Sequence, residues 1–131
     1  MRKNGLLHAK LAEIITAAGH GDLIVIGDAG LPVPTHTPVI DLAVVPGLPA
    51  FLPVLKVILA ELATEAALIA SETAQYNPVI STGITTLLGD LPQETITHTA
   101  LKALCQQAKV VVRTGECTPY ANIILRAGVT F

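Results

Sequence analysis

The sequence predicts a single α/β domain, residues 1–131, with a mostly parallel central sheet and helices on its faces. A chain of 131 residues is long enough for one hydrophobic core and too short for two. Short apolar runs rich in branched residues are typical of buried strands, and segments with apolar residues at helical spacing lie between them. This alternation of helix and strand indicates an α/β fold.

The first half of the chain predicts two helices and two strands. Apolar residues at helical spacing indicate a helix over residues 10–18, with Gly19 where a C-terminal cap belongs. The continuous apolar run Leu23–Ile26 then predicts a buried strand. The other elements expected here are a strand over Val39–Val45 and a helix over Ala50–Leu62.

The second half predicts two further helices and two strands, while Ala66–Ala70 fits either a helix end or a strand. Pro78 suits the first position of a helix that Gly89 ends. Thr97 or Thr99 can cap another helix. The two remaining strands are expected at Val110–Val112 and Ile123–Leu125, on either side of a turn-rich loop over Gly115–Asn122.

Composition argues against several classes of partner. The formal charge is only −2, so nothing predicts binding to nucleic acid or to a membrane surface. The longest apolar region, Leu42–Leu55, has 14 residues interrupted by three prolines, which is too short for a membrane span. Because 51% of the residues are hydrophobic and only 14% are charged, apolar surface is left to cover, and we expect a homo-oligomer larger than a dimer.

The N-terminus and the cysteines favour a cytoplasmic protein. Lys10 and Glu13 interrupt the stretch where an apolar signal region would lie. Cys105 and Cys117 stand alone without metal-ligand spacing, so we interpret them as two reduced thiols. The motifs of nucleotide-phosphate loops, zinc hydrolases and serine nucleophile elbows do not occur. We therefore expect no cofactor and no metal.

Two polar clusters adjoin predicted strands, and ligands of open α/β sheets bind beyond strand ends. In the first cluster, His20 and Asp28 flank the strand Leu23–Ile26. Structural roles are equally open for both, because a histidine can complement the carbonyl end of a helix and an aspartate can close a turn. The second cluster, Thr114–Asn122, gathers hydroxyl, phenol, amide and carboxylate groups in one loop. That loop is either a binding loop or a plain turn.

The other histidines are less informative. His98 lies between two threonines, where it fits a helix-capping segment as well as a site. His8 and His36 have no neighbours that support a site. With the stronger motifs absent, the residues favour acid–base chemistry on a small polar ligand.

Several long motifs are specific enough to indicate a family. They are Asp28-Ala-Gly-Leu-Pro-Val-Pro34, Ile40-Asp-Leu, Pro46-Gly-Leu-Pro-Ala-Phe51 and Arg113-Thr-Gly-Glu-Cys-Thr-Pro-Tyr-Ala-Asn-Ile-Ile-Leu125, together with His20. With these motifs the chain resembles the ribose pyranase and fucose mutarotase superfamily. The resemblance runs from Asn4 to Phe131, is loose over Ala60–Glu94, and at the C-terminal end is closest to the ribose branch.

The resemblance implies interconversion of the pyranose, furanose and anomeric forms of free D-ribose through an open-chain intermediate. It implies His20 as the general acid, with Asp28 holding either the imidazole or a sugar hydroxyl. The sugar contacts that it implies are Asp28, His98, Tyr120, Ala121 and Asn122, of which Ala121 offers only backbone groups.

Further points of the resemblance leave alternatives open. Lys102, one helical turn beyond His98, is a further candidate contact, whereas His36 has no counterpart in the family pattern. The resemblance also implies a ring-shaped oligomer, a decamer. The group that removes the anomeric proton is not identified. The alternatives to ribose pyranase are a non-catalytic sugar-binding module and an L-fucose mutarotase of the same superfamily.

Overall fold

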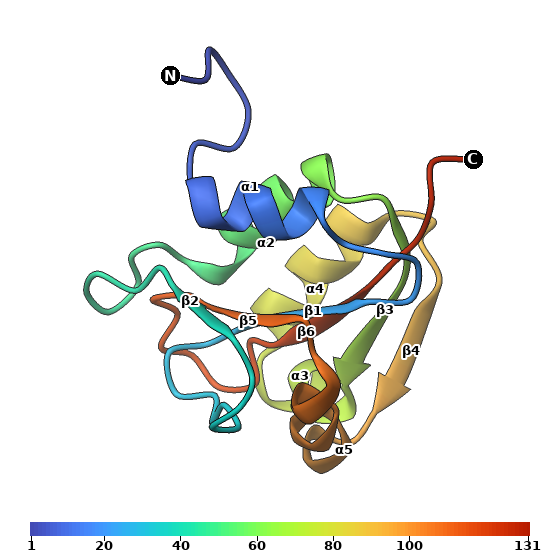
Figure 1. The fold of residues 1–131 in the computed structure, drawn as a ribbon. Coiled ribbons are helices and arrows are strands. Elements are labelled where there is room, and N and C mark those ends of the chain that lie inside the picture. The colour runs from blue at the N-terminus through green and yellow to red at the C-terminus, as the bar shows by residue number, and fades with distance from the viewer.

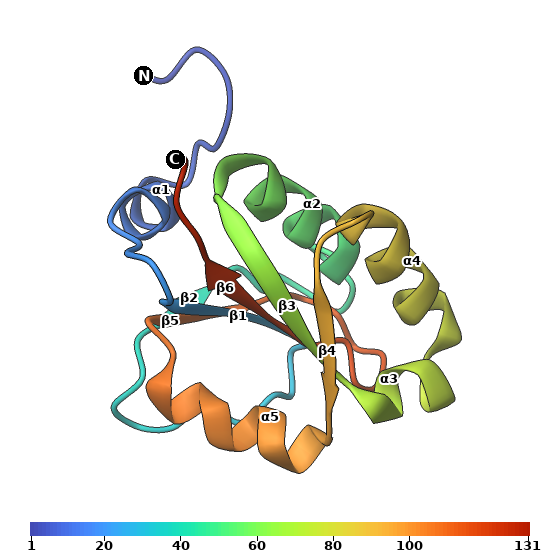
Figure 2. The same ribbon diagram turned by 90° about the vertical axis from the view of Figure 1, so that its right-hand side faces the viewer.

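Six strands form one sheet, and helices cover both of its faces (Figures 1 and 2). The computed structural model describes residues 1–131. The strands are β1 (Leu23–Gly27), β2 (Val39–Asp41), β3 (Thr64–Ala70), β4 (Gln93–Ile96), β5 (Val110–Arg113) and β6 (Ile123–Ala127). The helices are α1 (Ala9–Thr16), α2 (Phe51–Glu61), α3 (Ser71–Tyr76), α4 (Pro78–Leu88), α5 (His98–Leu104) and the 3₁₀ turn η1 (Cys105–Gln107).

The order of the strands is β2-β5-β1-β6-β3-β4. Three of the five pairings are parallel, namely β2 with β5, β5 with β1, and β3 with β4. The last strand, β6, runs antiparallel between β1 and β3 and joins the two parallel parts. The predicted α/β fold with a mostly parallel sheet is confirmed.

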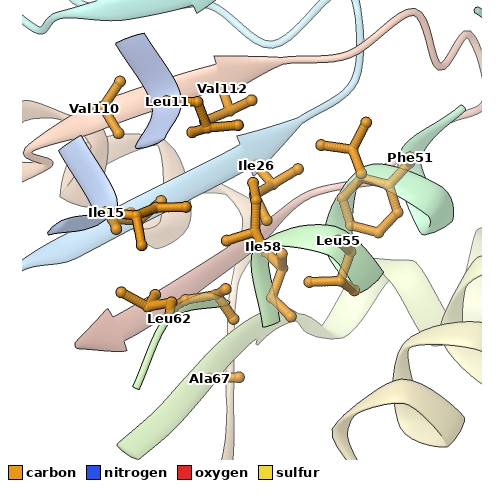
Figure 3. Close-up of a cluster of buried hydrophobic side chains, with 14 of the residues drawn as sticks. Leu11, Ile15, Ile26, Phe51, Leu55, Ile58, Leu62, Ala67, Val110 and Val112 are labelled. Carbon is orange, nitrogen blue, oxygen red and sulfur yellow. The ribbon is translucent and has the colours of Figure 1, made fainter. Parts of the chain in front are cut away.

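The larger hydrophobic core lies between the sheet and the helices α1, α2 and α4, which share one face (Figure 2). Figure 3 shows Leu11 and Ile15 of α1 and Leu55 and Ile58 of α2 against the strands, with Phe51 at the start of α2. Each such side chain contributes about 1.5–3 kcal/mol by leaving water. This packing holds the inner strands β1 and β5 in fixed register.

The opposite face is covered by α5 (Figure 2). Leu101 and Cys105 pack there against Val25, Val111 and Ile124 of the central strands. Burial raises the pKa of the Cys105 thiol, so this group stays protonated and behaves as a small apolar side chain.

The helix ends follow local capping chemistry, with one correction. As predicted, α4 begins at Pro78 and ends before Gly89, and Thr97 caps α5 by accepting a hydrogen bond of 3.1 Å from the amide of Ala100. Gly19, in contrast, is not the cap of α1. That helix ends at Thr16, because the Gly19 amide donates instead to the Asp22 carboxylate and closes the turn into β1.

Two strand predictions need correction or completion. The strand predicted over Val39–Val45 ends at Asp41. There the Asp41 carboxylate accepts a hydrogen bond from the Ala43 amide and pairs with the Arg113 guanidinium. The ambiguous segment Ala66–Ala70 belongs to strand β3. The sequence pattern missed α3 and the edge strand β4, whose residues are mostly exposed and polar. None of the helices has the length and apolarity that a membrane crossing requires.

Candidate functional site

Four of the predicted site residues lie at one edge of the sheet. Asp28 directly follows β1, His98 follows β4 as the first residue of α5, and Tyr120 and Asn122 immediately precede β6. Because β6 is antiparallel to β1 and β3, its first residue pairs with Ile26 near the end of β1 and with Ile69 near the end of β3. The fold therefore brings these four side chains to the same end of neighbouring strands, where open α/β sheets bind ligands.

Asp28 and Asn122 hold each other by two hydrogen bonds. The Asp28 amide donates to Asn122 Oδ1, and Asn122 Nδ2 donates to Asp28 Oδ2, both at 3.0 Å. The second carboxylate oxygen, Oδ1, accepts the amide of Gly30 at 2.9 Å. Asn122 is fully buried, so its side chain has one orientation, and the carboxylate beside it is fixed as an acceptor for a ligand hydroxyl.

A glycine precedes this pair because there is no room for a larger residue. A Cβ atom at Gly27 would lie 3.0 Å from Asn122 Oδ1 and 2.6 Å from a methyl group of Leu31. The Gly27 carbonyl also accepts two hydrogen bonds from Thr114, one from its amide at 2.9 Å and one from its hydroxyl at 2.8 Å. These contacts fix the end of β1 and with it the position of Asp28.

Tyr120 has an unusual backbone conformation, with φ at +56°. Its carbonyl accepts the Thr73 hydroxyl at 2.8 Å and the Asn122 amide at 3.0 Å. Its ring packs against two others, with centroids 5.5 Å from Tyr76 and 5.0 Å from His98, the latter edge-on at 87°. The phenol and the His98 imidazole therefore belong to one aromatic group.

His98 is held through its backbone and is open to a ligand through one ring nitrogen. Its amide donates to Glu72 Oε2 at 2.9 Å, and its Nδ1 is buried without a partner. The remaining nitrogen, Nε2, is the atom that can bond a ligand. The pKa of Glu72 is lowered, first by the hydrogen bond from its own amide and also by the one from His98.

The other predicted contacts have different surroundings. The Ala121 side chain is buried in the core, so only its backbone can face a ligand. Lys102 lies exposed on α5. His36 is outside the group, with Nε2 at 3.3 Å from the carbonyl of Gln106, and His8 caps α1 by accepting the amide of Leu11. No three His, Cys, Asp or Glu side chains are arranged to hold a metal ion.

His20 lies at the other end of β1 from Asp28. The five residues of β1, at about 3.3 Å each, put about 16 Å between them. His20 Nε2 contacts Glu65 Oε2 at 2.8 Å, and its side chain is 61% exposed. Two roles are predicted for Asp28. Within one chain Asp28 does not hold the His20 imidazole, whereas its contact with a sugar hydroxyl stays a prediction.

A β-bulge presents Glu65 to His20. The register between β3 and β6 shifts between Thr64 and Ala66, which leaves Glu65 as the extra residue, and bulges commonly re-aim a side chain in this way. His20 also lines a pocket of about 340 Å³ together with Glu61 and the C-terminal residues 127–131. A histidine with a carboxylate on one nitrogen thus faces an open concave surface.

Sequence reasoning missed the residues that support these groups, which are Glu65, Glu72, Thr73 and Tyr76. They lie in the stretch that resembles the superfamily loosely, so no motif marked them. One signal was present, since Ser71, Glu72 and Thr73 directly follow the apolar end of β3 in the same way that Asp28 follows β1. Because Ala66–Ala70 fitted either a helix end or a strand, the sequence did not show that these polar residues follow a strand.

Comparison with known proteins gives consistent matches over the full chain. Residues 1–130 match the model of the RbsD / FucU transport protein family. A D-ribose pyranase of Symbiobacterium thermophilum is 56% identical over 131 residues, which cover 100% of both chains. The family indicated by the motifs is thus found again by comparison of whole chains.

Solved structures agree. RbsD of Bacillus subtilis, complexed with D-ribose, matches with a TM-score of 0.97 and 45% identity over 100% of both chains. The fucose mutarotase of Streptococcus pneumoniae, in complex with L-fucose, matches with a TM-score of 0.71 over 96% of this chain and 100% of its own, and at 23% identity this likeness concerns the fold alone. The chain belongs to the RbsD / FucU transport protein family.

Proposed function

We propose that this chain is a D-ribose pyranase, an isomerase that interconverts the pyranose, furanose and anomeric forms of free D-ribose without a cofactor. The observation that carries the proposal is the hydrogen-bonded pair of Asp28 and Asn122 beside Tyr120 and His98. It lies in a chain that matches a D-ribose complex over its whole length and closely resembles proteins named D-ribose pyranase.

The sugar contacts follow from the donors and acceptors at the sheet edge. The Asp28 carboxylate accepts sugar hydroxyls, while the Tyr120 phenol and His98 Nε2 can each donate or accept. The backbone of Ala121 adds a further polar contact between Tyr120 and Asn122. Because Asp28 and Asn122 already fix each other, little side-chain freedom is lost when the sugar binds.

The reaction needs two proton transfers. To open the ring, His20 donates a proton to the ring oxygen while the bond from that oxygen to the anomeric carbon breaks and the anomeric hydroxyl gives its proton to solvent water. Closure by a different hydroxyl, or on the other face of the aldehyde, gives the other ring or anomer. Imidazole titrates near neutral pH, and a positioned acid of this kind accelerates a proton transfer by about 10²- to 10⁴-fold. With Nε2 on Glu65, Nδ1 is the free nitrogen that exchanges the proton.

His20 acts on sugar held by a neighbouring copy of the chain. A group about 16 Å away, at the other end of a five-residue strand, is beyond reach of a sugar bound at Asp28. Its exposed ring is accessible to a second copy. When one end of each chain meets the opposite end of the next, the contact is head-to-tail, and such contacts form a ring where the rotation from copy to copy closes. A ring with more than two members, the decamer implied by the resemblance, fits this arrangement.

Exposed apolar side chains support an assembly of this kind. Those with more than half of their surface exposed include Leu7, Val44, Val45, Leu48 and Val79. Val44, Val45 and Leu48 lie together in one loop, and clustered exposed apolar side chains commonly mark a contact with another chain. We predict that light scattering at micromolar concentration gives a mass above that of a dimer. A monomer would contradict both the assembly and a site shared between copies.

The substrate test compares two sugars. We predict that NMR magnetisation transfer between the ring forms of D-ribose speeds up in proportion to added protein, and that L-fucose exchanges more slowly. Equal or faster exchange of L-fucose would favour the mutarotase branch. Binding of D-ribose without any acceleration would favour a sugar-binding module.

We place the reaction in the cytoplasm, which the free thiols of Cys105 and Cys117 support.

A further inference from the structure

We propose that Thr73 is a positioning residue for sugar binding and acts through Tyr120. Thr73 belongs to the short helix α3, which follows β3 at the edge of the sheet where the sugar contacts gather (Figure 1). The inference rests on the proposed function only in naming D-ribose as the ligand. It adds a residue that touches no sugar but determines the position of those that do.

Tyr120 needs support from its surroundings. A φ of +56° is rare for a residue with a bulky side chain, and such a conformation persists only where neighbouring groups hold it. The Tyr120 carbonyl has two donors, the amide of Asn122 and the hydroxyl of Thr73. Only the Thr73 bond ties this carbonyl to another part of the fold, because Asn122 lies in the same loop.

The Thr73 hydroxyl is suited to this role by burial and by chemistry. The residue is fully buried, so water cannot replace the bond of 2.8 Å to the Tyr120 carbonyl. Loss of the hydroxyl would leave the Tyr120 carbonyl with only the Asn122 amide of its own loop as donor, which favours a change of backbone conformation. Since Tyr120 and Asn122 are two residues apart, such a change moves both the phenol and the amide that holds Asp28.

The neighbours of Thr73 hold the same region. Asn77, which follows α3, donates from Nδ2 to the Thr118 hydroxyl at 2.9 Å and to the Pro119 carbonyl at 2.8 Å. Glu72 binds the His98 amide, and Tyr76 packs on the Tyr120 ring. The segment from Glu72 to Asn77 therefore contacts both His98 and the loop that holds Tyr120. Its only hydrogen bond to Tyr120 itself comes from Thr73.

Thr37 provides a matched control. It is also a buried threonine whose hydroxyl donates to a backbone carbonyl, that of Cys105, at 2.9 Å. That carbonyl lies in the 3₁₀ turn after α5 and contacts none of the sugar-binding residues. A substitution of Thr37 by Val thus removes the same kind of bond without touching Tyr120.

The test compares Thr73→Val, Thr73→Ser and Thr37→Val by calorimetry with D-ribose and by ring exchange at saturating sugar. Thr73→Val should raise the Kd for D-ribose about tenfold, as expected for loss of one hydrogen bond, with exchange at saturation close to the parental rate. Thr73→Ser should restore the affinity, and Thr37→Val should lower the Tm but keep the parental Kd. An unchanged Kd in Thr73→Val, or an equal rise in Thr37→Val, would overturn the proposal.

A double-mutant cycle shows whether the effect passes through Tyr120. Tyr120→Ala removes the phenol but keeps the carbonyl that Thr73 binds, so in this background Thr73→Val should raise the Kd by less than in the parental chain, through Asn122 alone. The same tenfold loss in both backgrounds would contradict a role through Tyr120. If Thr73→Val does not fold, Thr73→Ala and Thr37→Ala take the same places with the same expected outcomes. Failure of the parental protein to accelerate exchange would refute the pyranase activity alone, because the calorimetric comparison stands without it.

Discussion

Replacing His20 by Ala is expected to slow the ring exchange of D-ribose by about two orders of magnitude or more, the usual cost of losing a general acid. The sugar should still bind, because Asp28, Tyr120 and Asn122 lie at the opposite end of β1 and keep their contacts. The rate is measured by NMR magnetisation transfer and the affinity by calorimetry.

His36→Ala is the matched control for this variant, since His36 is also an exposed histidine and lies outside the site. It should exchange D-ribose at the parental rate. If His20→Ala abolishes binding, or keeps the parental rate of exchange, His20 is not the acid.

Replacing Asn122 by Ala is expected to weaken D-ribose binding by about ten- to a hundredfold, since breaking a buried hydrogen-bonded pair costs about 1–3 kcal/mol. Asn122 is fully buried, and both of its hydrogen bonds fix Asp28. Without them the carboxylate loses its fixed position. The result should appear as a higher Kd in calorimetry, with exchange at saturating sugar reduced much less.

Asn4→Ala, a change in the exposed N-terminal segment, is the control for asparagine loss and should bind D-ribose as the parental chain does. A variant Asn122→Ala with parental Kd and strongly reduced exchange would place Asn122 in proton transfer. His20→Ala and Asn122→Ala thus have opposite signatures, one in rate and one in affinity.

The predictable parts of the fold are those with strong apolar patterns. Leu23–Ile26 and Val110–Val112 are continuous apolar runs, and they form the adjacent inner strands β1 and β5. β4 was not predicted because an edge strand with solvent on one side needs few apolar residues, and Gln93–Ile96 has one. α3 escaped because six residues are too few for a helical pattern.

The site was predictable as far as strand ends reveal it. Asp28 and Tyr120–Asn122 adjoin apolar runs, and the family resemblance added His98. Thr73 escaped because its bond to Tyr120 spans 47 positions of the chain, and no local pattern records such a contact. The separation of His20 from Asp28 follows from the sequence itself, because the two residues flank one strand, but no sequence pattern shows which chain places His20 at the sugar, and we propose a second copy.

Mixing these two impaired variants tests this arrangement most directly. Oligomers formed from equal amounts of His20→Ala and Asn122→Ala chains, unfolded and refolded together, contain sites in which one chain supplies His20 and the other supplies Asn122. Random assembly makes about one quarter of the sites intact if each site joins two neighbouring copies. We predict recovery of about a quarter of the parental ring exchange at low D-ribose concentration, measured against each variant refolded alone. A mixture no more active than the average of its two components would contradict a site built from His20 of one copy and Asn122 of the next.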